Sequence, residues 1–272
     1  MPELPEVETI KRDLEKDVLG KTIVKVIVNR PGIIKQPSLH EFKKILTGAR
    51  FTRILRRGKF LVLEIETGKK KVFFLAAHLR MTGQFVYGSK DPKNRVCLRF
   101  EDNSFLNYND KRTLGELRII ADWRNLNIVK NMGPEPLDRR FRPGMFRQML
   151  LQRSAKIKPL LLDQSFVAGI GNIYATEALF MSGIHPSRAA NKLRDYEIRT
   201  LFKNIQKVLK LAIQCRGSSF SDYRDGHGRE GGFTQHFFVY GRKKELCLQC
   251  RTPIKRMTLG GRGTYYCGKC QR

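Results

Sequence analysis

The sequence predicts an α+β protein of two domains, in which a helix and a β-sandwich or barrel come first and a helical region follows. Three observations lead to this prediction. Short runs rich in Val, Ile and Phe dominate residues 22–122, and three prolines and two glycines interrupt the pattern at residues 132–144. Helical spacing then takes over. A chain of 272 residues is long enough for two domains of ordinary size.

The first element is a helix over residues 3–19. Its apolar residues recur at spacings of three and four and so lie on one face: Leu4, Val7, Ile10, Leu14 and Val18. Acidic residues near its start suit the positive end of the helix dipole, and Gly20 suits the position just past its end.

Seven strands are expected next, each short, rich in β-branched or aromatic residues and bounded by Gly, Asp or Asn. They are TIVKVIV (22–28), FTRIL (51–55), KFLVLEIE (59–66), KVFFLAAHL (71–79), RVCLRFE (95–101), SFLNYN (104–109) and ELRIIAD (116–122). Leu63 and Ile65 alternate with glutamates, as in a strand with one buried face. EDNS at 101–104 predicts a hairpin turn.

Four helical segments follow the interruption: MFRQMLLQR (145–153), IKPLLLDQ (157–164), NIYATEALFMSGI (172–184) and YEIRTLFKNIQKVLKLAIQC (196–215). The turn VAGIGN (167–172) joins two of them. Either its glycines let the backbone approach a phosphate, with Asn172 as the N-cap of the next helix, or it is an ordinary turn between helices. The Gly- and Ser-rich stretch that begins at residue 217 predicts a mobile loop.

Charge is the most prominent feature of the composition. Lys and Arg total 53 against 25 Asp and Glu, which gives a formal net charge of +28. Such an excess is typical of proteins that bind polyanions, although a solvated basic surface would produce the same count. Nucleic acid is favoured over a membrane because no basic amphipathic tail stands out. No apolar run approaches a membrane span of ~18 residues, and the N-terminus does not resemble a signal peptide, so we expect a cytoplasmic protein.

Four of the six cysteines form two close pairs in the pattern C-x2-C-x16-C-x2-C: Cys247, Cys250, Cys267 and Cys270. This spacing is typical of a zinc ribbon, in which both pairs bind one tetrahedral metal ion. Two disulfides are the alternative, and a reducing cytoplasm argues against them. Cys97 and Cys215 lie in apolar stretches and are expected to be buried.

The opening MPELPEVETI allows a chemical interpretation and a structural one. Removal of the initiator Met would leave Pro2 with a free secondary amine, and an α-amine has a pKa of roughly 7.7–8. The neutral fraction could attack an electrophilic sugar carbon and form an iminium, with Glu3 beside it to move protons. Alternatively, Met-Pro is a common start, and Glu3 and Glu6 only cap a helix.

Six stretches match a known family in the same order: PELPEVET (2–9), GPEPL (133–137), VAGIGNIYATEALF (167–180), GIHP (183–186), VYGR (239–242) and GRGTYYC (261–267). With these stretches the chain closely resembles bacterial formamidopyrimidine-DNA glycosylase, which removes oxidised purines. The resemblance covers essentially the whole chain, and six stretches in register are specific although each alone is weak. Leu4 is typical of this branch, whereas the sister branch that removes oxidised pyrimidines has Gly there.

The resemblance implies an N-terminal helix plus β-sandwich, and a C-terminal helix-two-turn-helix module with a zinc-ribbon-like β-hairpin and one structural Zn²⁺. DNA would lie in the cleft between the domains. The expected segments are a catalytic domain 1–131, a linker 132–142, a helix-two-turn-helix domain 143–216, a mobile lesion-capping loop 217–237 and a zinc-finger hairpin 238–272.

The resemblance also implies roles for single residues. Pro2 would be the nucleophile that forms a Schiff base at the sugar C1′. Glu3 would be its acid/base partner, and Glu6 a supporting carboxylate. Lys59 would hold a phosphate and assist β-elimination. Arg262 would hold the phosphate at the lesion and assist δ-elimination.

Further residues are expected to contact DNA. The family fills the space left by an extruded base with Met, Arg and Phe, and this chain supplies Met81 and Arg112. Leu114 stands where the aromatic residue is expected, so we expect weaker discrimination against the neighbouring base pair. The other expected contacts are Lys93 with Arg95, Arg153, Asn172 and Tyr240.

The expected function is that of a bifunctional DNA glycosylase and abasic-site lyase that excises 8-oxoguanine and formamidopyrimidines, then cleaves the strand by β,δ-elimination. A preference for oxidised pyrimidines, a DNA-damage-binding protein without catalysis and a basic RNA-binding zinc protein are the alternatives. The expected partner is double-stranded DNA with oxidised bases or abasic sites. No membrane partner is expected, and the protein would be a monomer in a bacterial cytoplasm, associated with the nucleoid.

Overall fold

A computed structural model describes all 272 residues, which divide into two compact units. The first unit comprises Met1–Lys130 and Ile213–Gly232, and the second Asn131–Ala212 and Phe233–Arg272. Residues 213–232, which belong to the first unit, therefore lie in the sequence between the two segments of the second unit. None of its helices is both long enough and apolar enough to cross a membrane.

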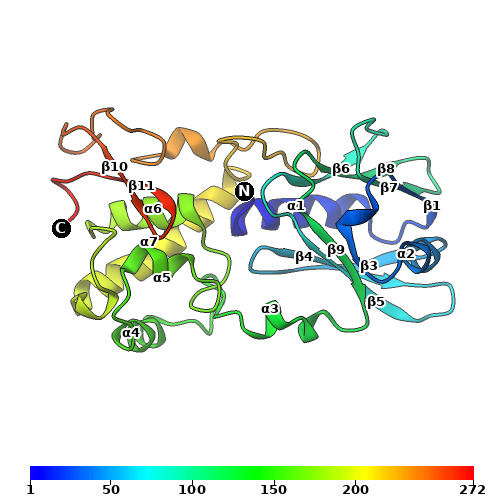
Figure 1. Cartoon of the computed structure of the whole chain (residues 1–272), viewed down its shortest axis with the longest axis horizontal. Helices are drawn as coiled ribbons and strands as arrows, with labels where there is room; N and C mark the ends of the chain where they lie inside the picture. The colour runs from blue at the N-terminus through cyan, green and yellow to red at the C-terminus, as the bar shows by residue number, and fades with distance from the viewer. The chain divides into compact units, whose positions relative to one another are not determined.

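The first unit is a β-sandwich with a long helix (Figure 1). One sheet has the strand order β1-β7-β8-β6 and the other β2-β9-β5-β4-β3, and only β2 and β9 pair in parallel. The strands are β1 (Ile23–Val28), β2 (Ile34–Gln36), β3 (Arg50–Arg57), β4 (Phe60–Glu66), β5 (Val72–His78), β6 (Gly83–Gly88), β7 (Val96–Phe100), β8 (Phe105–Asp110) and β9 (Glu116–Ile120).

The helix α1 (Leu4–Asp17) contributes to the same core as the two sheets. All five residues of its predicted apolar face are fully buried, which confirms the helical spacing. Burying each such side chain is worth about 1.5–3 kcal/mol. The helix ends two residues earlier than predicted, and Gly20 follows with a φ of 78°, a backbone conformation that favours glycine.

All seven predicted strands are present, and the hairpin turn between β7 and β8 is confirmed. In β4 the predicted alternation holds only from Leu63 onward, because residues 60–62 are all buried. Sequence analysis missed β2, β6 and the helix α2 (Leu39–Leu46). A signal for α2 existed, because Ser38 accepts a hydrogen bond from the Glu41 N–H in the spacing of a capping box. β6 is bounded by glycines at both ends, which weakens any strand pattern.

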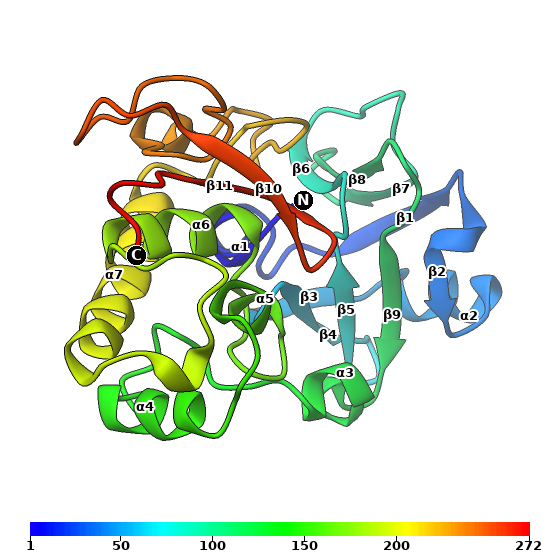
Figure 2. The same cartoon turned by 60° about the vertical axis from the view of Figure 1, so that its left-hand side comes forward.

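The second unit contains the predicted helices and a C-terminal hairpin. The helices are α4 (Pro143–Leu151), α5 (Ile157–Leu162), α6 (Asn172–Met181) and α7 (Asp195–Gln214), which runs on into the first unit. A one-turn helix, α3 (Asn127–Lys130), precedes them. The hairpin of β10 (Lys255–Leu259) and β11 (Arg262–Tyr266) lies beside α6 (Figure 2).

A buried carboxylate ties the approach to this hairpin onto α6. Glu177 is fully buried, and its two oxygens accept the N–H groups of Phe238, Val239 and Tyr240 at 2.8, 3.1 and 2.7 Å. Burial raises the pKa of the Glu177 carboxyl, while the three N–H donors act in the opposite direction. Residues 238–240, which precede the cysteines, are therefore fixed to α6.

The loop after α7 is anchored on α1. The Ser218 N–H donates to Glu6 and the Gly226 N–H donates to Asp13, at 2.9 and 3.0 Å. Arg216 pairs with Asp13 at 2.6 Å and with the fully buried Asp225 at 2.5 Å. The predicted loop is therefore anchored at its start and again near residues 225 and 226. The mobility of the rest of the loop stays a prediction.

A histidine at the end of β5 predicts acid sensitivity of the first unit. The pKa of His78 is lowered to about 4 by burial, and further by the charges of Arg80 and Lys59. The unfolded chain takes up this proton near its ordinary value of 6.5, so stability falls as the pH drops from about 6.5 to about 4. His78→Gln removes this proton uptake. Between pH 7 and pH 5 its free energy of unfolding should therefore rise by ~2 kcal/mol relative to that of the wild type.

Urea unfolding followed by the fluorescence of Trp123, the single tryptophan, measures this difference in the first unit. Parallel stability curves for the two proteins over that pH range would contradict the assignment.

Candidate functional site

The start of the chain is built into the structure. Pro2 is buried, and Glu3 and Glu6 are each 2% exposed. Glu3 is the N-cap of α1, and its N–H donates to a Glu6 oxygen at 2.8 Å. The other Glu6 oxygen accepts the Ser218 N–H. Glu6 therefore fixes the backbone beside Pro2 and the first residues of the loop with one carboxylate.

The close fit of this loop explains a glycine. Gly217 has a φ of 85°, and a Cβ there would lie 3.0 Å from the Glu6 side chain and 2.9 Å from the ring of Tyr223. Any larger residue would push the loop away from Glu6 and strain the backbone.

Lys59 lies in the tight turn between β3 and β4. The register pairs Arg57 with Phe60, which leaves Gly58 and Lys59 as a two-residue loop, and Gly58 has a φ of 55°. A glycine in the first position of such a loop is typical of β-hairpins. Lys59 is only 7% exposed, and its charge acts on the neighbouring His78. The Lys59 side chain is thus largely buried rather than free in solvent.

The three residues expected to enter DNA lie on two connections in the first unit. Met81 is 38% exposed on the connection from β5 to β6. Arg112 and Leu114 lie on the connection from β8 to β9, where Leu114 is 47% exposed. Exposure alone does not single these residues out, since Leu248 and Tyr196 are more exposed, and their contact with DNA stays a prediction.

Lys93 and Arg95 line an open cavity of about 700 Å³ in the same unit. Lys111 and Arg224 line it as well, and sequence analysis did not identify them. They carry no motif, so only their position in the fold singles them out. Four cations around one depression suit an anionic partner, although three aspartates also line it.

In the second unit, Arg262 is exposed at the first position of β11. Lys158 holds this hairpin, because its ammonium group donates to Thr264 and Asn172 at 2.6 Å and to the Gly263 carbonyl at 3.3 Å. Lys158 is fully buried. Sequence analysis missed it, since one lysine among 53 basic residues has no distinguishing signal.

Asn172 is not the N-cap that the sequence predicted. The N-cap of α6 is Gly171, and Asn172 is the first helical residue. Its side chain accepts from Lys158 and donates to the Gly263 carbonyl at 3.1 Å and the Tyr240 hydroxyl at 3.3 Å. The prediction failed because the amide finds partners from distant segments instead of the adjacent helix end. Arg153 is exposed just beyond α4.

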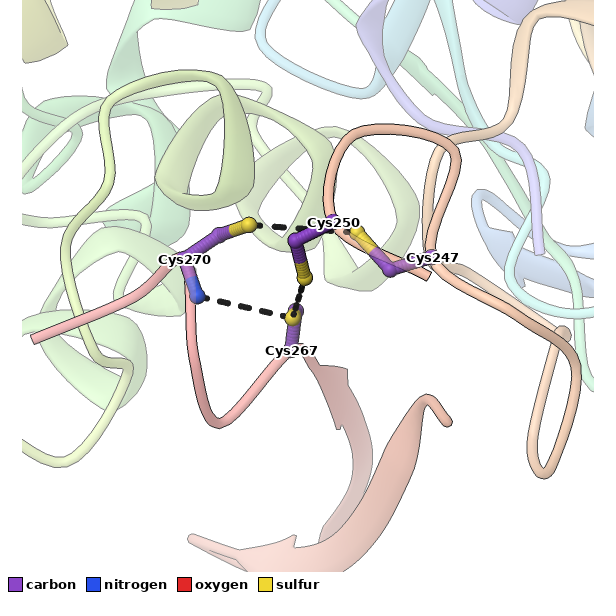
Figure 3. A group of neighbouring side chains, drawn as sticks. All are labelled: Cys247, Cys250, Cys267 and Cys270. Atoms are coloured by element: carbon purple, nitrogen blue, oxygen red, sulfur yellow. Dashed lines mark hydrogen bonds between the residues drawn. The ribbon is translucent and has the colours of Figure 1, made fainter. Parts of the chain in front are cut away.

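The four C-terminal cysteines converge, and their sulfur atoms lie within 4.8 Å of one another (Figure 3). Two of the S···S distances are 3.4 Å and 3.9 Å, much longer than a disulfide bond of ~2.05 Å. Four thiolates around one zinc ion at ~2.3 Å have S···S distances of about 3.8 Å. The cysteines therefore fit one structural zinc, and Phe180, Val239 and Ile254 pack around them.

The two other cysteines differ from each other. Cys97 is fully buried as expected, whereas Cys215 at the end of α7 is only partly buried. The expectation for Cys215 was wrong because the end of α7 is covered less completely than its apolar sequence suggests.

Cys250→Ser should cost the protein its zinc and disorder the hairpin that carries Arg262, because three thiolates and a hydroxyl bind zinc much more weakly. Elemental analysis of zinc per chain and amide hydrogen exchange of β11 measure both effects. Cys215→Ser, outside the cluster, is the matched control and should keep one zinc. A native protein that has no zinc but a fully protected hairpin would contradict the prediction.

Three family models match the chain in sequence. Residues 1–117 match the formamidopyrimidine-DNA glycosylase N-terminal domain, and residues 132–224 match the H2TH domain of the same family. Residues 244–272 match the zinc finger found in FPG and IleRS.

Known proteins agree with these models over the full chain. The formamidopyrimidine-DNA glycosylase of Brevibacillus brevis is 41% identical to this chain, and the match covers 100% of this chain and 99% of the relative. The Bacillus licheniformis enzyme of the same name is 40% identical, and the match covers 100% of both chains. The Fpg crystal structure from Thermus thermophilus has a TM-score of 0.88 at 38% sequence identity, and the match covers 99% of this chain and 98% of that one. The structure of Lactococcus lactis Fpg in complex with abasic-site DNA has a TM-score of 0.90 at 35% sequence identity, and the match covers 99% of each chain. The chain belongs to the formamidopyrimidine-DNA glycosylase family.

Proposed function

We propose that this chain is a bifunctional DNA glycosylase and abasic-site lyase that extrudes and excises oxidised purines from duplex DNA. The observation that carries the proposal is the fixed N-terminus: Pro2 is buried beside Glu3, whose backbone N–H is held by Glu6. Family membership over the whole chain and the net charge of +28 support the same activity.

The proposed chemistry begins after removal of Met1. The Pro2 nitrogen attacks C1′ of the extruded nucleoside, the bond from C1′ to the base breaks, and the base leaves with a proton. Glu3 moves the proton that opens the sugar ring and leaves a Schiff base on Pro2. Loss of a C2′ proton then expels the 3′ phosphate, and a second elimination expels the 5′ phosphate. Lys59 and Arg262 hold these phosphates and neutralise the departing charge.

Other residues prepare this step. Met81, Arg112 and Leu114 fill the space left by the base, and Lys93, Arg95 and Arg153 contact the backbone. Asn172 and Tyr240 act through the hairpin, because the Asn172 amide bonds the Gly263 carbonyl beside Arg262. The division into catalytic domain, linker, helix-two-turn-helix domain, loop and zinc hairpin belongs to the same proposal, as does a location with the nucleoid in the cytoplasm.

Oxidised purines are the favoured substrates over oxidised pyrimidines. Leu4 matches the purine branch in PELPE, and the Lactococcus lactis relatives were solved with DNA that contains Fapy-dG or its N7-benzyl derivative. The deciding experiment uses duplexes with 8-oxoguanine, formamidopyrimidine or an oxidised pyrimidine and scores base release and strand cleavage separately. Release of both purine lesions with strand cleavage supports the proposal. Faster release of the pyrimidine, or binding without release, overturns it.

Variants at the N-terminus should separate nucleophile from proton carrier. A Met1-retaining form acylates the Pro2 nitrogen, so base release and strand cleavage should both fail while DNA binding survives. Pro2→Gly keeps an amine that is positioned less rigidly, so activity should drop without vanishing.

Glu3→Gln should slow base excision more than lyase action on a pre-formed abasic site, because that sugar is already open to attack. Borohydride trapping measures the covalent step in every variant. If the Met1-retaining form is still trapped on DNA, another amine is the nucleophile, and Lys59 is then the first to test.

Salt dependence should identify the phosphate contacts. Lys59→Ala and Arg262→Ala should each reduce the log–log slope of affinity against salt by about 0.9, because each removes one cationic phosphate contact. Asn172→Ala should weaken binding with little change of slope, since asparagine carries no charge. Lys69→Ala, at the exposed turn between β4 and β5, is the control. An unchanged slope for Lys59→Ala or Arg262→Ala would remove that residue from the phosphate set.

A further inference from the structure

The chain passes from one sheet of the sandwich to the other at two neighbouring corners. Corner one, residues 79–82, joins β5 to β6, and corner two, residues 111–115, joins β8 to β9. The strands that flank them are paired on both sides: His78 lies opposite Glu116 in one sheet, and Gly83 lies opposite Asp110 in the other. The two corners therefore run side by side (Figure 1).

Each corner presents an exposed apolar residue directly after a residue with positive φ. Arg80 has a φ of 52° and precedes Met81, and Thr113 has a φ of 53° and precedes Leu114. A β-branched residue in this conformation is strained, and such strain persists only where the surroundings fix the backbone. The surroundings of the two corners must therefore supply that constraint.

A buried carboxylate joins the corners. Asp110 is 1% exposed, and one of its oxygens accepts from the Thr82 hydroxyl at 2.5 Å and from the Arg112 N–H at 3.2 Å. Its other oxygen accepts the Gly115 N–H at 2.7 Å. The Thr82 hydroxyl also accepts the Arg112 N–H at 3.0 Å. Asp110 thus bonds both ends of corner two and the last residue of corner one.

The corners also close onto one tyrosine. A Cβ at Gly115 would lie 1.8 Å from the Tyr108 hydroxyl oxygen, and a Cβ at Gly83 would lie 2.6 Å from it. Tyr108 is 1% exposed. A salt bridge adds a second link: Arg80 in corner one pairs at 2.6 Å with Glu116, the first residue after corner two. The two corners have no room to move independently without breaking these contacts.

We propose that Asp110 and Thr82 are positioning residues that hold the two corners as a single wedge, so that Met81, Arg112 and Leu114 enter the duplex together as the damaged base leaves. This inference rests on the proposed function. A carboxylate is required because all of its partners are donors. An asparagine would direct its NH₂ group at one of them whichever way the amide is turned.

The test compares Thr82→Val, which removes the hydroxyl at nearly constant shape, with Thr82→Ser, which keeps it. Asp110→Asn is a second variant, and Asp102→Asn, at the exposed turn before β8, is its matched control. Excision of 8-oxoguanine from a duplex under single turnover should fall about tenfold in Thr82→Val and Asp110→Asn. It should stay within about twofold of wild type in Thr82→Ser and Asp102→Asn. Borohydride trapping on a pre-formed abasic site should change little, because no base has to be extruded.

A second measurement separates positioning from general loss of structure. If Thr82 acts through the wedge, the effect of Thr82→Val should shrink to within about twofold in a background in which Met81, Arg112 and Leu114 are all replaced by alanine. A loss of the same size in that background would overturn the proposal, as would full excision by Thr82→Val. If Asp110→Asn does not fold, the valine and serine variants decide. Wild-type protein that neither releases the base nor is trapped would overturn the proposed function itself, whereas active wild type with an unaffected Thr82→Val overturns only the positioning role.

Discussion

The carboxylate of Glu6 is the interaction on which the proposed chemistry depends most directly. It bonds the Glu3 N–H on one side and the Ser218 N–H on the other, so one side chain fixes the backbone beside Pro2 and the start of the loop. At 2% exposure this carboxylate would be costly without such donors. The function proposed for Pro2 therefore needs a chain that returns to its own first helix more than 200 residues later.

The same physical device recurs in both units. Glu177 accepts three N–H groups, Asp110 accepts two N–H groups and a hydroxyl, and Lys158 donates to three oxygens. Each of these charges is 0–1% exposed and joins segments that no single helix or strand would hold together. Removing one partner leaves a buried charge unsatisfied, which costs more than the bond itself contributes. Loops and hairpins that carry the proposed site residues are therefore fixed by buried charges, with zinc adding a further constraint at the C-terminus.

Leu114 shows how such a scaffold tolerates change at its tip. The residue is 47% exposed, while the backbone below it is held by Asp110 and packed on Tyr108. A leucine in place of the expected aromatic ring changes only the exposed tip, because the contacts that hold the corner come from Asp110 and Tyr108. Burial raises the pKa of Tyr108, so its hydroxyl stays protonated and adds no charge beneath the corner.

By itself, the sequence determined the features that depend on local pattern: the apolar face of α1, the seven strands, the four zinc ligands and the ordered stretches that identify the family. The positions of Pro2, Glu3 and Arg262 came with those stretches and that of Lys59 with the wider resemblance, and the roles of all four stay predictions. Only the tertiary structure revealed Lys158 beneath the hairpin, the true partners of Asn172 and the link from Thr82 to Asp110. These contacts join residues 14 to 106 positions apart in the chain. Periodicity and spacing report only on neighbours along a helix or strand, so side chains that meet across the fold leave no trace in them.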